Sequence, residues 1–129
     1  MMSYLKIVSN NILPLSEAAS LPHAFKEWRF TENTIDHLDA VETCRLCEKK
    51  GLRYHFEIAN RLTQNVLMVG SHCILKFGVA VFEDGNLLSL PEAKKKLHRL
   101  TEQLRLDSCI NALKSLASKE NTGILKGWS

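Results

Sequence analysis

Residues 44–77 read CRLCEKKGLRYHFEIANRLTQNVLMVGSHCILKF, and this stretch decides the fold that we expect. Within it, Leu52–Ile58 alternates apolar and polar side chains, which is the period of a strand with one buried face. The polar run Asn60–Gln64 follows, and Asn65–Val69 has the composition of a second strand. Two strands joined by a short polar connection predict a β-hairpin.

The cysteines of this stretch have the spacing of a metal site. Cys44 and Cys47 form a CxxC pair, and Gly51 suits the sharp turn that leaves such a knuckle. Centring the hairpin turn near residue 62 pairs Gly51 with Cys73, which returns Cys73 to the CxxC pair. Thioredoxin-like redox motifs share the CxxC spacing, but they lie at a strand-to-helix junction, whereas this pair enters a hairpin. A knuckle, a hairpin and a cysteine at a helix start predict a treble-clef-like site with Zn²⁺ as the cofactor.

The fourth zinc ligand is open between two histidines. His72 is the first choice because it lies next to Cys73, although two neighbouring residues bind one ion only where the backbone turns sharply. His37, seven residues before the knuckle, is the alternative. His55 ranks last because it lies about four residues along its strand from the metal end, or ~13 Å. The fourth cysteine, Cys109, lies in an apolar helical stripe and is expected to be a core thiol.

The flanking segments complete an α+β domain. Proline in the first turn favours a short helix from Leu21, and Trp28–Ile35 has the pattern of a third strand. A capping box of Ser89 and Glu92 begins a C-terminal helical region, residues 89–120, whose apolar stripe changes register near Asp107. We therefore expect a treble-clef-like zinc knuckle and β-hairpin with a third strand, followed by a C-terminal helical pair. Residues 1–129 form a single domain, with the zinc-binding module at about residues 26–85.

The composition is that of one folded domain. The chain has 129 residues, of which 45% are hydrophobic and 24% charged, as in ordinary globular proteins. No segment approaches the ~20 apolar residues of a membrane span, and the N-terminal residues lack the pattern of a secretory signal. Because disulfides belong to exported proteins, we expect a cytoplasmic protein with reduced cysteines and no membrane partner.

The order of these motifs resembles a known family. Cys44-x2-Cys47, a strand that begins at Arg53, and VGSHCILKF at residues 69–77 are similar to the C-x2-C…VGS-x-C-I-x-K-F zinc-binding module of small, largely uncharacterised bacterial and bacteriophage proteins. The resemblance covers about residues 26–85 and implies that Cys44, Cys47 and Cys73 are zinc ligands. The residue at position 72 varies among the relatives, which favours His37 as the fourth ligand. The resemblance is specific for the module but says little about activity.

Two matches to catalytic motifs are interpreted as coincidental. His55-Phe56-Glu57 matches the HxE of zinc deaminases, but in those enzymes the CxxC follows the HxE, and here it precedes it. Asp36-His37 matches the pair of HNH-type nucleases, but it lies before the knuckle, and residues 74–77 supply no further Asn or His. Phosphate-binding loops and GxSxG motifs are absent from the sequence. We therefore expect a non-catalytic binding protein.

Charge is distributed unevenly along the chain. Residues 1–43 have a net charge of −3, residues 44–90 of +2 and residues 91–129 of +4. A basic module and a basic C-terminal region favour a nucleic acid as the partner. The alternative is a protein-protein interaction adaptor or inhibitor that acts on a host or replication protein through the C-terminal helices. The candidate nucleic-acid contacts are Arg45, Lys49, Lys50, Arg53, Arg61, Lys94, Lys95, Lys96 and Arg99.

Overall fold

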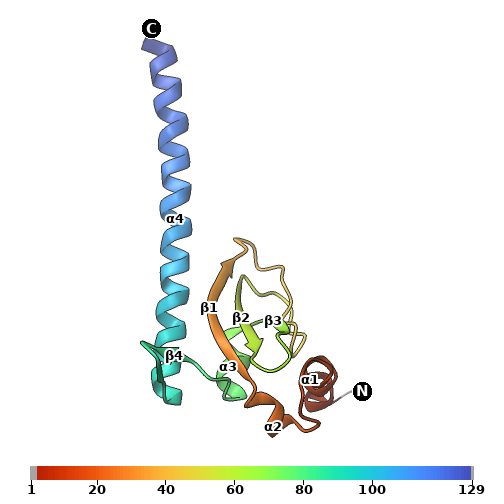
Figure 1. Cartoon of the computed structure of the whole chain (residues 1–129). Coiled ribbons are helices and arrows are strands. Elements are labelled where there is room, and N and C mark those ends of the chain that lie inside the picture. Colours follow the sequence, from red (N-terminus) through yellow and green to blue (C-terminus); the bar gives the residue numbers. More distant parts are fainter. Residues whose placement is uncertain (1–2, 129) are drawn as a thin grey trace.

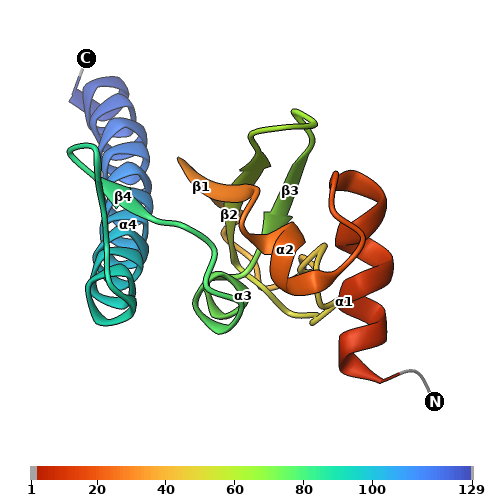
Figure 2. The same cartoon turned by 60° about the horizontal axis from the view of Figure 1, so that its bottom comes forward.

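The computed structural model describes the backbone of residues 3–128 and the side chains of residues 3–117. It is mixed α+β, as expected, with a three-stranded antiparallel sheet, short helices around it and a long C-terminal helix that extends away from the sheet (Figure 1). The elements are α1 (Tyr4–Ile12), the 3-10 helix η1 (Leu13–Leu15), α2 (Leu21–Phe25), β1 (Trp28–Asp36), β2 (Tyr54–Asn60), β3 (Val66–Val69), α3 (Ser71–Lys76), β4 (Phe82–Glu83), β5 (Asn86–Leu87) and α4 (Leu90–Trp128). In two views the sheet lies between α1 and α4 (Figure 2).

The predicted hairpin is formed by β2 and β3, with a register that differs by one residue from the prediction. The pairs Phe56–Val69 and Ala59–Val66 centre the turn between residues 62 and 63. The difference arises because residues 61–64 form the loop, which is closed by a hydrogen bond from the Asn60 N–H to the Asn65 carbonyl. The side-chain oxygen of Asn60 also accepts backbone N–H groups inside the loop, as is typical of asparagine in turns.

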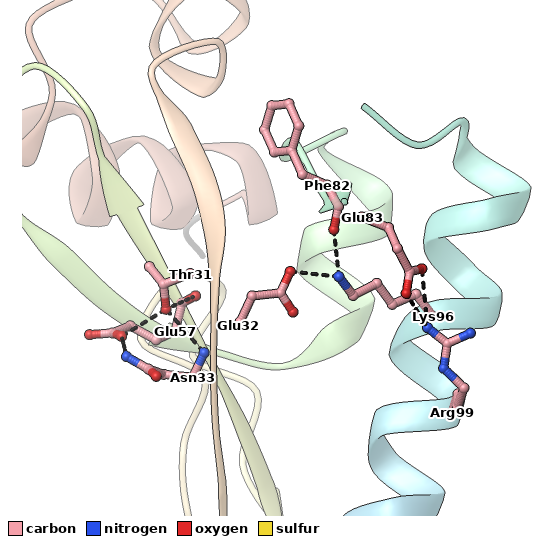
Figure 3. Close-up of polar contacts among 8 residues, drawn as sticks. All are labelled: Thr31, Glu32, Asn33, Glu57, Phe82, Glu83, Lys96 and Arg99. Carbon is pink, nitrogen blue, oxygen red and sulfur yellow. Dashed lines mark hydrogen bonds and ion pairs between the residues drawn. The ribbon is translucent and has the colours of Figure 1, made fainter. Parts of the chain in front are cut away.

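The predicted third strand is confirmed, since β1 pairs antiparallel with β2. The pairing shifts register after residue 30, and Glu32 there has a φ of 78°, so the strand is bulged. The Glu57 carboxylate on β2 holds this bulge by accepting hydrogen bonds from the hydroxyl of Thr31 and the amide of Asn33 (Figure 3). As a result, the side chain of Glu32 points away from Glu57 and toward α4 (Figure 3).

The N-terminal segment is attached to the hairpin loop through a buried carboxylate. Glu27, 5% exposed, accepts hydrogen bonds of 2.8 Å from the backbone N–H groups of Glu17 and Ala18 and from the side-chain amide of Asn60. The hydrogen bond from Asn60 is the main cause that lowers the pKa of Glu27. The apolar residues of α1 then pack against the sheet, although the first twenty residues show only a weak hydrophobic pattern in the sequence.

One core joins the helices to the sheet, because each contributes buried side chains to it. Its members include Val8, Ile12, Phe25, Trp28, Phe30, Leu46, Phe56, Ile58, Val69, Ile74, Val81, Ala93 and Leu97.

The C-terminal region is one continuous helix, so the predicted helical pair is wrong. The change of register near Asp107 does not break the helix, since no glycine or proline lies between Glu92 and Thr122. Instead, the first apolar stripe packs on the domain through Ala93 and Leu97, and the second stripe lies on exposed helix surface. This exposed group comprises Leu106, Ile110, Leu113 and Leu116. Cys109 is exposed as well, so its prediction as a core thiol is also wrong.

Ion pairs and hydrogen bonds join α4 to the rest of the chain. The buried ammonium of Lys96 lies 2.6 Å from the carboxylate of Glu32 and donates to the backbone carbonyl of Phe82 (Figure 3). Arg99 pairs with Glu83 at 3.0 Å on the exposed side of the same helix (Figure 3).

A second polar contact of α4 is centred on Asp36, at the end of β1. Its carboxylate accepts two hydrogen bonds from Arg53, at 2.8 and 3.0 Å, and one from the hydroxyl of Ser108 on α4. Arg53 is the main cause that holds the pKa of Asp36 well below its usual range. The Asp36 side chain is 6% exposed, so these bonds are shielded from water.

Replacement of this carboxylate is expected to destabilise the fold in a pH-dependent way. Asp36→Asn keeps the shape of the side chain but loses charge-assisted hydrogen bonds, so the free energy of unfolding should fall by about 2 kcal/mol at neutral pH. Because the pKa is lowered in the folded state, the carboxylate stabilises fully above its unfolded pKa of about 4, and this effect declines progressively as the pH falls from there toward the lower folded pKa. Urea unfolding should therefore show a difference between wild type and variant that narrows as the pH falls toward about 3. A difference that is constant over this range would contradict the assignment.

Candidate metal centre

Three cysteine sulfurs lie close together at one end of the hairpin. Cys44 and Cys47 belong to the turn that precedes β2, and Cys73 lies in α3, directly after β3. The sulfurs of Cys44 and Cys73 are 3.7 Å apart, and all three lie within 4.8 Å of one another. Cys44 and Cys73 are each 1% exposed, and Cys47 is half-buried. The three cysteines thus lie at metal-binding distance, as the sequence predicts.

The backbone of the knuckle is shaped to hold these sulfurs. Gly51 has a φ of 79°, a left-handed conformation that glycine adopts readily, as predicted for the turn that leaves the CxxC pair. The Gly70 N–H points at the sulfur of Cys44 at 3.4 Å. A hydrogen bond from Cys73, together with the backbone N–H groups of Cys47, Gly70 and Leu46, lowers the pKa of Cys44 to about 5. A thiolate at Cys44 is therefore favoured near neutral pH.

The pKa of the neighbouring Cys73 thiol is shifted in the opposite direction. The hydrogen bond to Cys44, burial and the nearby sulfurs raise the pKa of Cys73. Negative charge on one sulfur thus opposes charge on the next, since like charges repel strongly where water is excluded. A cation among the three sulfurs removes this repulsion, so the donor set fits a metal ion with affinity for thiolates.

A tyrosine from α1 also reaches the cluster, and the sequence analysis missed it. The hydroxyl of Tyr4 lies 3.9 Å from the sulfur of Cys73, and burial and the sulfurs raise its pKa. The ammonium of Lys76 lies 4.0 Å from the centre of the tyrosine ring. The spacing of Tyr4, Val8 and Ile12 is that of one helix face, which is the signal that predicts a buried side for this segment.

The two candidate histidines lie in different places. His72 is exposed and lines the same hollow as the three cysteines, together with Lys49 and Arg53. His37 instead contacts His55, with 3.0 Å between Nε2 of His37 and Nδ1 of His55. Among the residues that the structure describes, His37 and His55 form a second cluster of metal-ligating groups with Glu42.

The basic residues singled out from the sequence fall into two groups. Arg53, Lys96 and Arg99 are paired with carboxylates of the chain, and Lys96 is buried. The others are exposed, namely Arg45, Lys49, Lys50, Arg61, Lys94 and Lys95.

The exposed basic residues near the cysteines line two adjoining hollows. Lys49 and His72 line the hollow beside the sulfurs, and His72, Lys76 and Lys94 line the next one. The knuckle, α3 and α4 therefore present basic side chains on one continuous surface, to which we refer as the basic surface.

No protein-family model, curated protein or solved structure matches this chain. In the described part of the chain, no helix combines the length and the hydropathy that a membrane span requires. The chemistry of the site therefore carries the functional argument.

Proposed function

We propose that Cys44, Cys47 and Cys73 bind a structural zinc ion. The observation that carries this proposal is the distance of 3.7 Å between the sulfurs of Cys44 and Cys73. Two thiolates on a tetrahedral zinc ion, each at a Zn–S bond of about 2.3 Å, lie about 3.8 Å apart. Zinc also prefers sulfur and nitrogen ligands, and the resemblance to the bacterial and bacteriophage module supports the same three cysteines.

His72 is our candidate for the fourth ligand. It supplies the only imidazole on the described wall of the hollow that contains the sulfurs. His37 is a weaker candidate because its Nε2 atom lies against His55. Four protein ligands close the coordination sphere, which is typical of structural rather than catalytic zinc. Glu57, the glutamate of the HxE match, is bound to Thr31 and Asn33, which supports a non-catalytic role.

We further propose that the zinc module binds nucleic acid through the basic surface. Lys49, Lys76 and Lys94 come from three segments that meet next to the sulfurs. Cationic side chains held on one surface bind phosphates whatever the base sequence. The zinc ion would then act indirectly, because it holds the knuckle and α3 in the positions from which Lys49 and Lys76 project.

A second candidate function is that of an adaptor or inhibitor that binds a protein through α4. Its support is the exposed apolar group Leu106, Ile110, Leu113 and Leu116. Apolar side chains at this spacing are typical of a helix that packs against a partner. The two candidates use different surfaces, so they are separable by substitution.

The zinc proposal predicts one ion per chain at the cysteines. Metal analysis of Cys44→Ser should show this ion lost, together with cooperative thermal unfolding, because the free energy of binding at a structural site is folding free energy. Cys109→Ser is the matched control, since Cys109 is exposed on α4, and it should keep both the ion and the wild-type melt. Retention of the cysteine-bound ion and an unchanged melt in Cys44→Ser would falsify the proposal.

The fourth ligand is tested with cobalt in place of zinc. The thiolate-to-cobalt charge-transfer band reports only on the cysteine centre, so Co²⁺ titrations followed at this band give its affinity. His72→Ala should weaken binding by more than the roughly 10–100-fold that loss of an outer-shell partner costs. His98→Ala, which changes another exposed histidine, is the control. A weakening in His37→Ala but not in His72→Ala assigns the fourth position to His37.

The nucleic-acid proposal predicts salt-dependent binding. With roughly three phosphate contacts, affinity for mixed-sequence DNA should fall about fortyfold between ~50 and ~200 mM salt, and that for RNA somewhat less. Lys94→Glu should weaken binding at both salt concentrations, and Lys114→Glu is the charge-matched control on the exposed part of the same helix. Absence of binding at either salt concentration excludes this function and leaves the adaptor candidate.

A further inference from the structure

His37, Glu42 and His55 form a compact group that the cysteine centre does not use. His37 follows β1, Glu42 lies in the connection before the knuckle, and His55 lies on β2. One ligand atom from each lies within 4.8 Å of the others. Residues far apart in the sequence therefore meet here with two nitrogens and one carboxylate.

A hydrogen bond to the backbone determines which nitrogen of His55 is available to bind a metal ion. Its Nε2 atom lies 2.9 Å from the backbone carbonyl of Thr43. A carbonyl only accepts hydrogen bonds, so Nε2 carries the proton and Nδ1 has a free lone pair. This lone pair faces Nε2 of His37 at 3.0 Å. Histidine ligands of metals are usually oriented by such a bond from their other nitrogen to a carbonyl or carboxylate.

Glu42 supplies a carboxylate beside His37, the other histidine of the group. The Nδ1 atom of His37 lies 3.9 Å from a carboxylate oxygen of Glu42. Because Nδ1 of His55 accepts, Nε2 of His37 donates the hydrogen bond between them, and a shift of this proton to Nδ1 of His37 leaves two neighbouring lone pairs for an ion. The Glu42 side chain is 33% exposed, so its carboxylate has room to turn toward an ion at that point.

From this geometry we propose a second metal site, in which His37 Nε2, His55 Nδ1 and the Glu42 carboxylate bind a divalent transition-metal ion. Two imidazoles on a tetrahedral ion, with bonds of about 2.05 Å, place their nitrogens about 3.3 Å apart. The two nitrogens are 3.0 Å apart in the structure, so the imidazoles need to separate only slightly to bind one ion. Two nitrogens and one oxygen suit Zn²⁺, Co²⁺ or Ni²⁺ rather than Mg²⁺ or Ca²⁺, which prefer oxygen.

The site differs from the cysteine centre in accessibility. His37 and Glu42 have side-chain exposures of 23% and 33%, and the three protein ligands leave a coordination position for water or a partner's group. An ion here would connect the end of β1 to the segment that enters the knuckle.

Calorimetric titration of Zn²⁺ into protein that already carries its cysteine-bound zinc tests this site. Wild type should bind one further ion, and His37→Ala should lose this second step. Glu42→Gln, a less disruptive change, should weaken it roughly 10–100-fold. The exposed His98 provides the control, since His98→Ala should bind both ions.

Cobalt distinguishes the two centres. Co²⁺ added to the zinc-loaded protein should give weak d–d absorption without the thiolate-to-cobalt band, because the new ligands are nitrogen and oxygen. The inference is overturned if no further ion binds in a large excess of Zn²⁺, if binding persists in His37→Ala, or if the thiolate band appears. If the cysteines bind no ion, Cys44→Ser contains as much metal as the wild type. Metal analysis of this variant therefore detects failure of the cysteine centre separately from failure of the second site.

Discussion

The rest of the structure depends on the approach of three sulfurs that electrostatics would otherwise keep apart. The hydrogen bond between Cys44 and Cys73, whose sulfurs are 3.7 Å apart, lowers the pKa of Cys44 with the help of backbone N–H groups and raises the pKa of Cys73. The knuckle, the end of β3 and the start of α3 all meet at this point, and α1 reaches it through Tyr4. A cation bound among the sulfurs, as we propose, would remove this repulsion and join these segments.

The long helix α4 is held on the domain in part by polar contacts, and not by the cysteine cluster. Among its described apolar side chains, only those of the first turns are buried. The ion pair of Lys96 with Glu32 and the hydrogen bond from Ser108 to Asp36 supply the direction of the helix. Buried ionic contacts of this kind demand matched partners, which favours a single orientation over many similar ones. From Cys109 to Ala117 the side chains are exposed, so α4 divides into a part that belongs to the domain and a part that extends from it.

Local pattern made much of the fold predictable. The alternation in residues 52–58 and the paired cysteines indicate the hairpin and the knuckle, and both are present with a register one residue from the prediction. The contact between His37 and His55 was not predictable in this way, because it depends on how far β1 extends along β2 and on the bulge at Glu32. Tyr4 was missed because its helix contacts the cysteines only through tertiary packing.

The sequence by itself determined the three main strands, the starts of α2 and α4 and the three cysteines, since these follow from periodicity, capping and ligand spacing within short segments. Tertiary structure alone decided that only the start of α4 packs on the domain, that Lys96 is buried against Glu32, and that the histidines form a cluster away from the sulfurs. The reason is physical: these outcomes depend on which partner a side chain meets across the fold. That partner is chosen by packing of the whole domain and not by neighbours along the chain.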